Sequence, residues 1–244
     1  FIHLKANSLQ TNYNDLAQVI PAIKKNPTPA FNKLGIITYK GTFTGFPMDF
    51  VAYGNYQTAL GNITSDLNMK LQPGKDPVYS GRVNSTGFNL GAFLNNAKLG
   101  MVALNTELKG NSFSLNDLDV TIKGNLTRFD YGGYSYRNIT LDGGIQNKYF
   151  SGKFSADDPN IKLSELFGSV NLAAKEPFLS ADAKVEYINL KNLGLTKENL
   201  RLSGIFNLNF KGDNIDNFLG SARIYKATLF KDSTKMSFDS LTLV

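Results

Sequence analysis

The sequence contains no cysteine and no tryptophan, and His3 is its only histidine. Without cysteine the chain forms neither a disulfide framework nor a thiolate metal site. A single histidine cannot supply the groups on which catalytic triads and zinc sites generally depend. No window approaches 18 consecutive apolar residues, so the sequence predicts no membrane-spanning helix.

The common motifs of catalysis and nucleotide binding are also missing. The sequence has no Gly-x-Ser-x-Gly elbow, no Gly-x-x-x-x-Gly-Lys loop and no Gly-x-Gly-x-x-Gly turn. A glycosidase with two carboxylates that are distant in sequence stays an open alternative, although no residue positively supports it. We therefore predict a protein that is not an enzyme and that has no cofactor and no bound metal.

Two acidic clusters have a structural interpretation and a functional one. They are Asp157 with Asp158 in "SADDPN" and Asp213 with Asp216 in "GDNIDN". Their carboxylates are suitable ligands for Ca²⁺, but neither cluster has the spacing of an EF-hand. Aspartate is also common in turns, where its side chain hydrogen-bonds to nearby backbone. We favour the turn interpretation.

The charged residues are moderate in number and are spread along the chain. The formal net charge is +6, and no long block of one sign occurs. A charge of this size gives a mild attraction to anionic surfaces such as lipid headgroups. It does not have the clustered form that is typical of nucleic-acid binding.

The first part of the chain has a helical pattern, and the rest does not. In "NDLAQVIPAIKKN" we expect Asn14 or Asp15 to cap a short helix that Pro21 weakens. We therefore divide the chain into residues 1–34, a short strand plus a helical connector, and residues 35–244, a repeating β segment.

From Gly35 onward the apolar residues recur at every second position. Roughly thirteen such runs end in turn sequences such as "QPGKDP", "KGNS", "YGGY", "DDPN" and "KGDN". This pattern predicts an antiparallel sheet with one apolar face and one solvated face. The residues predicted to share the apolar face are Ile63, Leu67, Met69, Leu71, Val102, Leu104, Leu108, Leu118, Val120, Ile122, Leu126, Ile139, Leu141, Ile145, Ala183, Val185, Leu200, Leu202, Phe206, Leu208 and Phe210.

A sheet with one apolar face must cover that face or use it. It can close as a β-sandwich, which would suit a glycan-binding module that uses the aromatic stretch Tyr131–Tyr136. It can form a membrane β-barrel, whose strands alternate in the same way. It can also stay open as an elongated, curled sheet that keeps an apolar groove for a ligand. At about 4.8 Å per strand, thirteen strands would then give a groove of roughly 60 Å.

Several long stretches resemble one protein family over nearly the whole chain. They are "DLAQVIPAIKKNPTPAFNKLG", "GIITYKGTFTGFPMDFVAYGNYQTALGNITSDLNMKL", "VNSTGFNLGAFL", "SYRNITLDGGIQNKYFSGKFSADDPNIKLSELFGSVNLA" and "FLSADAKVEYINLKNLGL". Together they are similar to the translocation and assembly module TamB, an AsmA-like repeating β-groove family, in its long Bacteroidota form. The family's membrane anchor and C-terminal domain are not recognisable here, and the chain ends within the alternating run "MSFDSLTLV". We therefore expect an internal piece of a longer protein.

The resemblance implies both a fold and a function. The fold is all-β, an elongated, curled antiparallel sheet that forms an open apolar groove, with a short N-terminal helical segment. The function is that of a periplasm-spanning bridge, which moves phospholipid between the inner and outer membranes of a Gram-negative bacterium and supports outer-membrane biogenesis. The implied partners are phospholipid acyl chains, an outer-membrane barrel of the TamA type and, through an anchor outside this chain, the inner membrane. A scaffold for outer-membrane protein translocation and assembly is the alternative within the same family.

Overall fold

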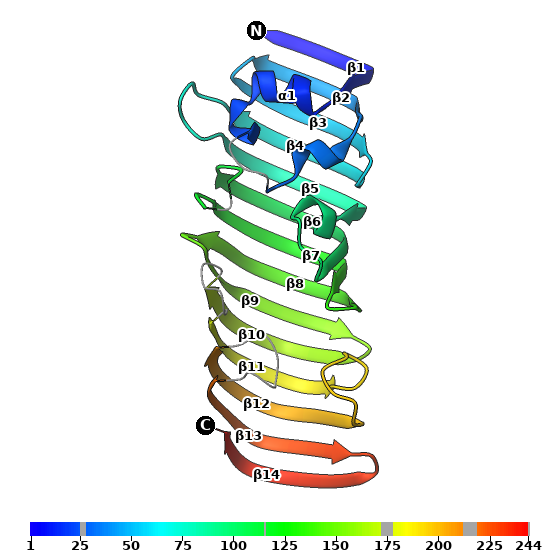
Figure 1. Ribbon diagram of the computed structural model, residues 1–244, viewed down its shortest axis with the longest axis vertical. Coiled ribbons are helices and arrows are strands. Elements are labelled where there is room, and N and C mark those ends of the chain that lie inside the picture. Colours follow the sequence, from blue (N-terminus) through cyan, green and yellow to red (C-terminus); the bar gives the residue numbers. More distant parts are fainter. Residues whose placement is uncertain (25–27, 115, 172–177, 212–218, 244) are drawn as a thin grey trace.

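The protein is a single long sheet that curls about its own length. The computed structural model describes residues 1–24, 28–114, 116–171, 178–211 and 219–243. Within them, fourteen strands form one antiparallel sheet in which every strand pairs with its neighbours in sequence. Strands follow one another along the molecule from the N-terminus to the C-terminus (Figure 1). The predicted all-β, elongated and curled antiparallel sheet with a short N-terminal helical segment is confirmed.

The strands have nearly equal lengths, so the sheet keeps a uniform width. In the first half they are β1 (Ile2–Thr11), β2 (Ile37–Phe46), β3 (Asp49–Thr58), β4 (Gly61–Lys70), β5 (Val78–Asn89), β6 (Leu99–Asn111) and β7 (Asp119–Tyr131). In the second half they are β8 (Tyr134–Gln146), β9 (Tyr149–Asp158), β10 (Ile161–Asn171), β11 (Phe178–Asn189), β12 (Leu200–Lys211), β13 (Leu219–Lys231) and β14 (Thr234–Leu243). The helical elements are α1 (Tyr13–Val19), η1 (Pro21–Lys24), η2 (Phe31–Leu34) and α2 (Leu90–Phe93).

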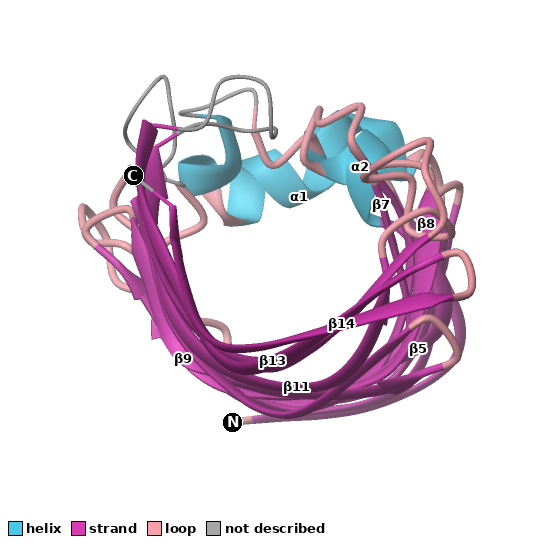
Figure 2. Ribbon diagram, turned by 90° about the horizontal axis from the view of Figure 1, so that it is seen from below, coloured by secondary structure: helices cyan, strands magenta, loops and turns pink. Residues whose placement is uncertain are grey.

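Seen along its length, the sheet has a U-shaped cross-section (Figure 2). We call the side where the even-numbered strands begin the first arm, and the side where they end the second arm. The sheet does not close on itself, because β1 and β14 each have a strand partner on one side only. Since the described strands form one sheet and not two, the β-sandwich alternative does not apply. At about 4.8 Å per strand, the sheet extends for roughly 60 Å.

Glycines within the strands let the sheet curl. Gly81 lies in β5 with φ +139°, and a Cβ at this position would collide with the backbone carbonyl oxygen of Asp66 in β4. Only glycine adopts this backbone conformation readily and tolerates so close an approach of the next strand.

The helical connector between β1 and β2, which the structure describes over residues 12–24 and 28–36, lies where the sequence predicted it but begins earlier. Asn12 caps α1 by accepting hydrogen bonds from the backbone N–H groups of Asn14 and Asp15. The predicted caps Asn14 and Asp15 are therefore wrong, because Asn12 already satisfies the first turn. The helix ends at Val19, consistent with the unfavourable helical conformation of a residue that precedes Pro21.

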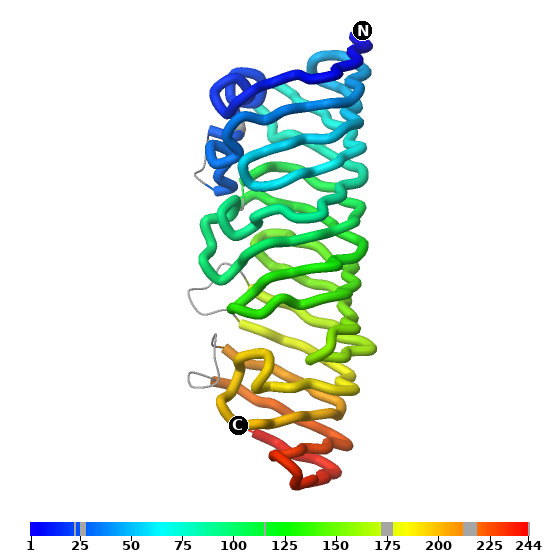
Figure 3. The backbone as a smooth tube through the Cα atoms, turned by 90° about the vertical axis from the view of Figure 1, so that its right-hand side faces the viewer, coloured from blue at the N-terminus to red at the C-terminus, as the bar shows by residue number. Residues whose placement is uncertain are grey.

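The connector packs onto the inner surface of the first arm. Leu34 lies in a buried cluster with Ile37, Phe88 and Val102. The partly buried residues around this cluster are Leu16, Phe31, Tyr56, Leu60, Ile63, Leu90, Phe93, Leu104, Leu126 and Phe129. The connector therefore covers the open side of the sheet beside its N-terminal strands, as the view from the side also shows (Figure 3).

Most predicted turns join strands where expected. The glycines of "YGGY" connect β7 to β8, and Pro159 with Asn160 connects β9 to β10. The turn predicted at "KGNS" is placed too early, because β6 continues to Asn111 through backbone pairing with Asp119. The predicted turn "KGDN" lies mostly outside the described residues.

Candidate functional site

The strand register joins the predicted apolar residues into rows that cross the sheet. One row connects Leu67 of β4 to Leu243 of β14 by direct cross-strand pairing. Its members in order are Leu67, Gly81, Leu108, Ile122, Gly143, Gly152, Gly168, Ala181, Leu208, Ala222 and Leu243. Two further rows run parallel to it, one on each side. One passes through Leu141 and Phe206, and the other passes through Val120 and Phe210. We call the surface formed by these rows the concave face.

Nineteen of the predicted residues lie on strands, and alternation within each strand gives them the same face. They are Ile63, Leu67, Met69, Val102, Leu104, Leu108, Val120, Ile122, Leu126, Ile139, Leu141, Ile145, Ala183, Val185, Leu200, Leu202, Phe206, Leu208 and Phe210. Leu71 and Leu118 instead lie in the segments that follow β4 and precede β7. Val102 belongs to the cluster beneath the connector, and Ile63, Leu104 and Leu126 pack against this cluster.

Most side chains on the concave face keep part of their surface accessible. Leu108, Ile122 and Phe206 are partly exposed, although each lies in the interior of a wide sheet. At the two edges of the sheet the exposure is greater, with Leu4 at 44% and Leu243 at 51% of their maximum. A closed core would bury all of these residues. The apolar surface therefore remains open to a ligand.

Sequence reasoning missed several aromatic members of the concave face. Phe150 and Phe154 of β9 occupy the two rows on either side of the row that contains Gly152, and their ring centroids are 5.3 Å apart. Phe43 of β2 and Phe50 of β3 lie in adjacent rows, with centroids 4.4 Å apart. The alternation in "FSGKF" was the signal that could have identified Phe150 and Phe154.

Glycines replace side chains in the middle of the concave face. Gly143, Gly152 and Gly168 are consecutive in one row across β8, β9 and β10. A Cβ on Gly143 would lie 2.6 Å from the carbonyl oxygen of Ser151 and 3.3 Å from the ring of Phe150. The backbone there is therefore approached closely by the neighbouring strand and by an aromatic ring.

Two buried polar residues interrupt the row through Leu141, but neither is left without a partner. Ser65 and Thr106 are 3% and 4% exposed. Their hydroxyl groups donate to the backbone carbonyls of Ala52 at 3.5 Å and Val83 at 3.4 Å. Since a buried hydroxyl that is hydrogen-bonded costs little, these positions are compatible with an apolar surface.

The opposite, convex face carries charge. One register row there consists of residues of alternating sign, all exposed: Asp66, Arg82, Glu107, Lys123, Asp142 and Lys153. Within it the Nζ of Lys123 lies 2.9 Å from the carboxylate of Asp142. Opposite charges on facing residues stabilise their pairing, and like charges would destabilise a shifted register. From β4 to β9 this row therefore gives the convex face a charged surface, with exposed Tyr53 and Phe167 at the two ends of the row.

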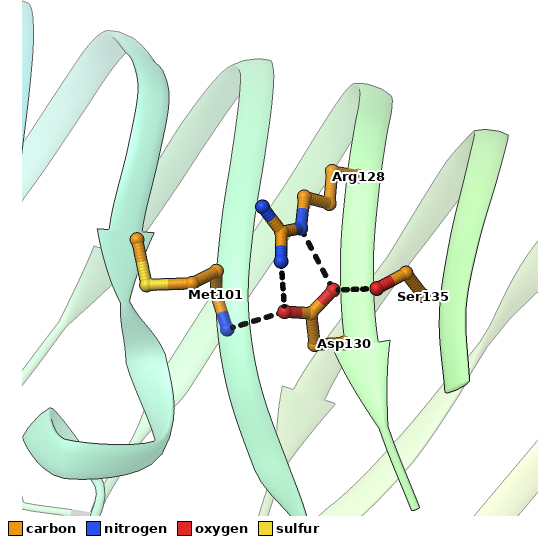
Figure 4. A network of polar contacts seen from close by, with 4 residues as sticks. All are labelled: Met101, Arg128, Asp130 and Ser135. Atoms are coloured by element: carbon orange, nitrogen blue, oxygen red, sulfur yellow. Dashed lines mark hydrogen bonds and ion pairs between the residues drawn. The ribbon is translucent and has the colours of Figure 1, made fainter. Parts of the chain in front are cut away.

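The strand ends at the first arm are tied together by two carboxylates. Asp130 of β7 accepts two hydrogen bonds from the Arg128 guanidinium, one from the Ser135 hydroxyl of β8 and one from the Met101 N–H of β6 (Figure 4). The Arg128 hydrogen bonds, reinforced by Ser135 and Met101 against an opposing effect of burial, lower the pKa of Asp130 to about 2. This carboxylate joins three successive strands.

The second carboxylate is Asp158, which is only 5% exposed. It accepts hydrogen bonds from the Tyr134 hydroxyl at 2.6 Å and from the N–H groups of Arg137 and Asn160, both at 2.8 Å. The bond from the Asn160 N–H is the turn geometry expected for "DDPN". Asp213 and Asp216 of the other acidic cluster lie outside the described residues.

The aromatic stretch Tyr131–Tyr136 lies at the first arm, where β7 turns into β8. The rings of Tyr134 and Tyr136 meet edge to face with centroids 4.8 Å apart, and Tyr131 stacks on Phe129 at 6.3 Å. Tyr131 itself is 43% exposed. The stretch therefore forms two separate ring pairs, one of which includes Phe129.

The described residues contain neither a cluster of potential metal ligands nor a long apolar helix. Histidine and acidic side chains there do not gather in a group of three or more that could hold a metal ion. None of the helices described is long and apolar enough to cross a membrane.

Comparison with known proteins identifies no relative. The chain matches no family model, no curated protein and no solved structure.

Proposed function

We propose that this chain is a segment of a lipid-transfer bridge of the TamB and AsmA-like kind, which carries phospholipid acyl chains along the concave face. One observation carries the proposal: an apolar row crosses the sheet from β4 to β14, and its leucine and isoleucine side chains stay partly or largely exposed. The row from Asp66 to Lys153 on the convex face, by contrast, is charged. In this proposal the bridge crosses the periplasm of a Gram-negative bacterium, is anchored in the inner membrane outside this chain and works with an outer-membrane barrel of the TamA type.

The energetics of lipid movement support an extended apolar surface. Exposing one sixteen-carbon acyl chain to water costs on the order of 10 kcal/mol, at about 0.8 kcal/mol per methylene group. A surface that offers the same apolar contact at every strand removes most of this cost without binding the lipid tightly at one point. Headgroups would stay in water at the open side of the U, where scattered lysines attract phosphate weakly.

Lipid extraction and mass spectrometry of protein purified from a bacterial host without detergent would test the proposal. We expect phospholipid well above trace amounts in the unmodified chain. Leu208→Asp should lower the amount about tenfold, because a carboxylate would then lie against the acyl chain between the small residues Ala181 and Ala222.

Asn209→Asp is the matched control, since it adds the same charge one residue away on the exposed face of the same strand. It should retain the lipid. If a folded Leu208→Asp protein retains as much lipid as the control, the concave face is not the lipid surface. Protein that carries no lipid at all would instead favour the alternative role, a scaffold for outer-membrane protein assembly.

A further inference from the structure

The connector touches both arms of the sheet through one side chain. The ring of Phe31 in η2 meets Phe93 of α2 edge to face, with centroids 5.3 Å apart, and it meets Phe113 at 5.7 Å. Phe93 belongs to the first arm, because α2 follows the end of β5. Phe113 belongs to the second arm, because it follows the end of β6. Phe31 therefore spans the open side of the U.

The contacts continue on both sides until they reach the two ends of a single strand. On the first arm Phe93 meets Phe88, near the end of β5, with centroids 5.4 Å apart. On the second arm Phe113 stacks on Tyr79, near the start of β5, also at 5.4 Å. The five rings Phe88, Phe93, Phe31, Phe113 and Tyr79, which we call the aromatic arch, thus close a ring of protein together with β5.

Hydrogen bonds hold the arch on both arms. The N–H of Ala30, next to Phe31, donates to the carbonyl of Phe93 at 2.7 Å. The buried hydroxyl of Tyr79 donates to the carbonyl of Ser112, next to Phe113, at 3.0 Å. Phe31 itself makes only ring contacts to the second arm among the described interactions. The closure therefore depends on a contact that can separate without breaking a hydrogen bond.

Some side chains beneath the arch keep part of their surface accessible. Val83, on the concave face of β5 between Tyr79 and Phe88, is partly exposed, and so are Leu67 and Leu108, which face Gly81 from the two adjacent strands. The direct partners of Val83, which are Ser65 and Thr106, are buried. A tightly packed cover would bury these side chains. At β5 the aromatic arch therefore crosses the open side of the U, whereas from β8 to β14 the described residues form no helix that covers the concave face.

We propose that the aromatic arch is a gate with Phe31 as its moving part, and that it stops phospholipid at β5 while it is closed. This proposal rests on the proposed function. A phospholipid on β8–β14 keeps its headgroup in water through the open side of the U. At β5 the closed arch lies in the path of that headgroup. The lipid therefore passes only when Phe31 separates from Phe113.

Photolabelling of the protein by its own cargo would test the gate. The probe is phosphatidylcholine with a diazirine midway along one acyl chain, supplied in phosphatidylcholine vesicles, and the labelled peptides are mapped by mass spectrometry. In the unmodified chain we expect labelling of the concave residues of β12 and little labelling of β5. In Phe31→Ala, which loses both edge-to-face contacts, labelling of β5 should rise about tenfold.

Two further variants make the result decisive. Phe113→Ala opens the arch from the opposite arm and should raise the labelling of β5 in the same way. It tests the gate even if Phe31→Ala does not fold. Phe167→Ala removes a ring that is 53% exposed on β10, outside the arch, and should leave the labelling pattern unchanged. Circular dichroism confirms the fold of each variant.

The outcomes separate the gate from the proposed function. Equal labelling of β5 and β12 in the unmodified chain would overturn the gate while supporting lipid binding. Labelling that stays confined to β12 in folded Phe31→Ala or Phe113→Ala would also overturn the gate. The absence of labelling anywhere on the concave face would overturn the proposed function, and the gate with it.

Discussion

Removing the carboxylate of Asp158 should destabilise the first arm, whereas removing its neighbour Asp157 should not. The two aspartates are adjacent, but Asp158 is 5% exposed and Asp157 is an exposed residue. Asp158 accepts three hydrogen bonds, from Tyr134, Arg137 and Asn160. Asp157 makes a side-chain ion pair with Lys162 at 3.9 Å. The pair of variants therefore compares a buried acceptor with a solvated one on the same turn.

The expected magnitude follows from the donors that lose their acceptor. Each buried donor without a partner costs about 1–3 kcal/mol, so two backbone N–H groups give roughly 3 kcal/mol for Asp158→Ala. The Tyr134 hydroxyl adds less, because its oxygen still accepts a hydrogen bond from the Asn160 side chain at 2.9 Å. An exposed ion pair contributes about 0–1 kcal/mol, so Asp157→Ala should cost no more than that.

Urea denaturation together with amide hydrogen exchange would measure both effects. The exchange of the Arg137 and Asn160 amides should accelerate in Asp158→Ala and stay unchanged in Asp157→Ala, since these N–H groups are the ones that lose their acceptor. Losses of stability within about 0.5 kcal/mol of each other in the two variants would refute the reasoning, because additive surface effects are of that size.

Raising the pH should weaken the second arm, because burial, with Asp119 nearby, raises the pKa of Tyr79 to about 12. Its contribution to stability is complete below pH about 10 and is lost as the pH rises toward about 12, so Tyr79→Phe should flatten this part of a stability curve. Lowering the pH should weaken the first arm, because the pKa of Asp130, at about 2, lies below its value in the unfolded chain. Its contribution is complete above pH about 4 and is lost as the pH falls toward about 2, and Arg128→Met should raise the pKa of Asp130 in an NMR titration. Gly81→Ala should lower the free energy of unfolding in urea by about 3 kcal/mol. Gly74→Ala should lower it by only about 1 kcal/mol, because Gly74 has φ +75° but no atom within 4 Å of the Cβ that alanine would add. Equal losses in the two variants would contradict the steric explanation.

The two faces of the sheet were predictable from the sequence because a strand repeats every two residues. Leu104 and Leu108, or Phe206 and Leu208, need no tertiary information to share a face. Alternation does not say which residues of one strand oppose those of the next. The glycine row through Gly152 was therefore invisible, although its members are plain in the sequence.

The contacts of the connector could not be derived from local pattern. Leu16 and Ile23 indicate that the helical segment needs an apolar partner, but they do not identify Leu34 or Phe88 as neighbours. Phe113 lies in a segment without periodicity, and its role depends on a ring that is 82 positions earlier in the chain. Contacts of this kind are set by the curl of the whole sheet.

The connector also shows what a covered concave face looks like in this protein. Beneath the connector, Val102 and Phe88 are only 3% and 6% exposed. On β12, by contrast, Phe206, Leu208 and Phe210 stay partly exposed. Full burial of one such side chain is worth about 1.5–3 kcal/mol, so the uncovered rows forgo a sizeable stabilisation that the same chain obtains elsewhere. The forgone stabilisation would be recovered if an apolar ligand covered the rows, and a mobile ligand such as an acyl chain recovers it at each strand in turn. We therefore expect lipid to raise the stability of β8–β14 more than that of β2–β7.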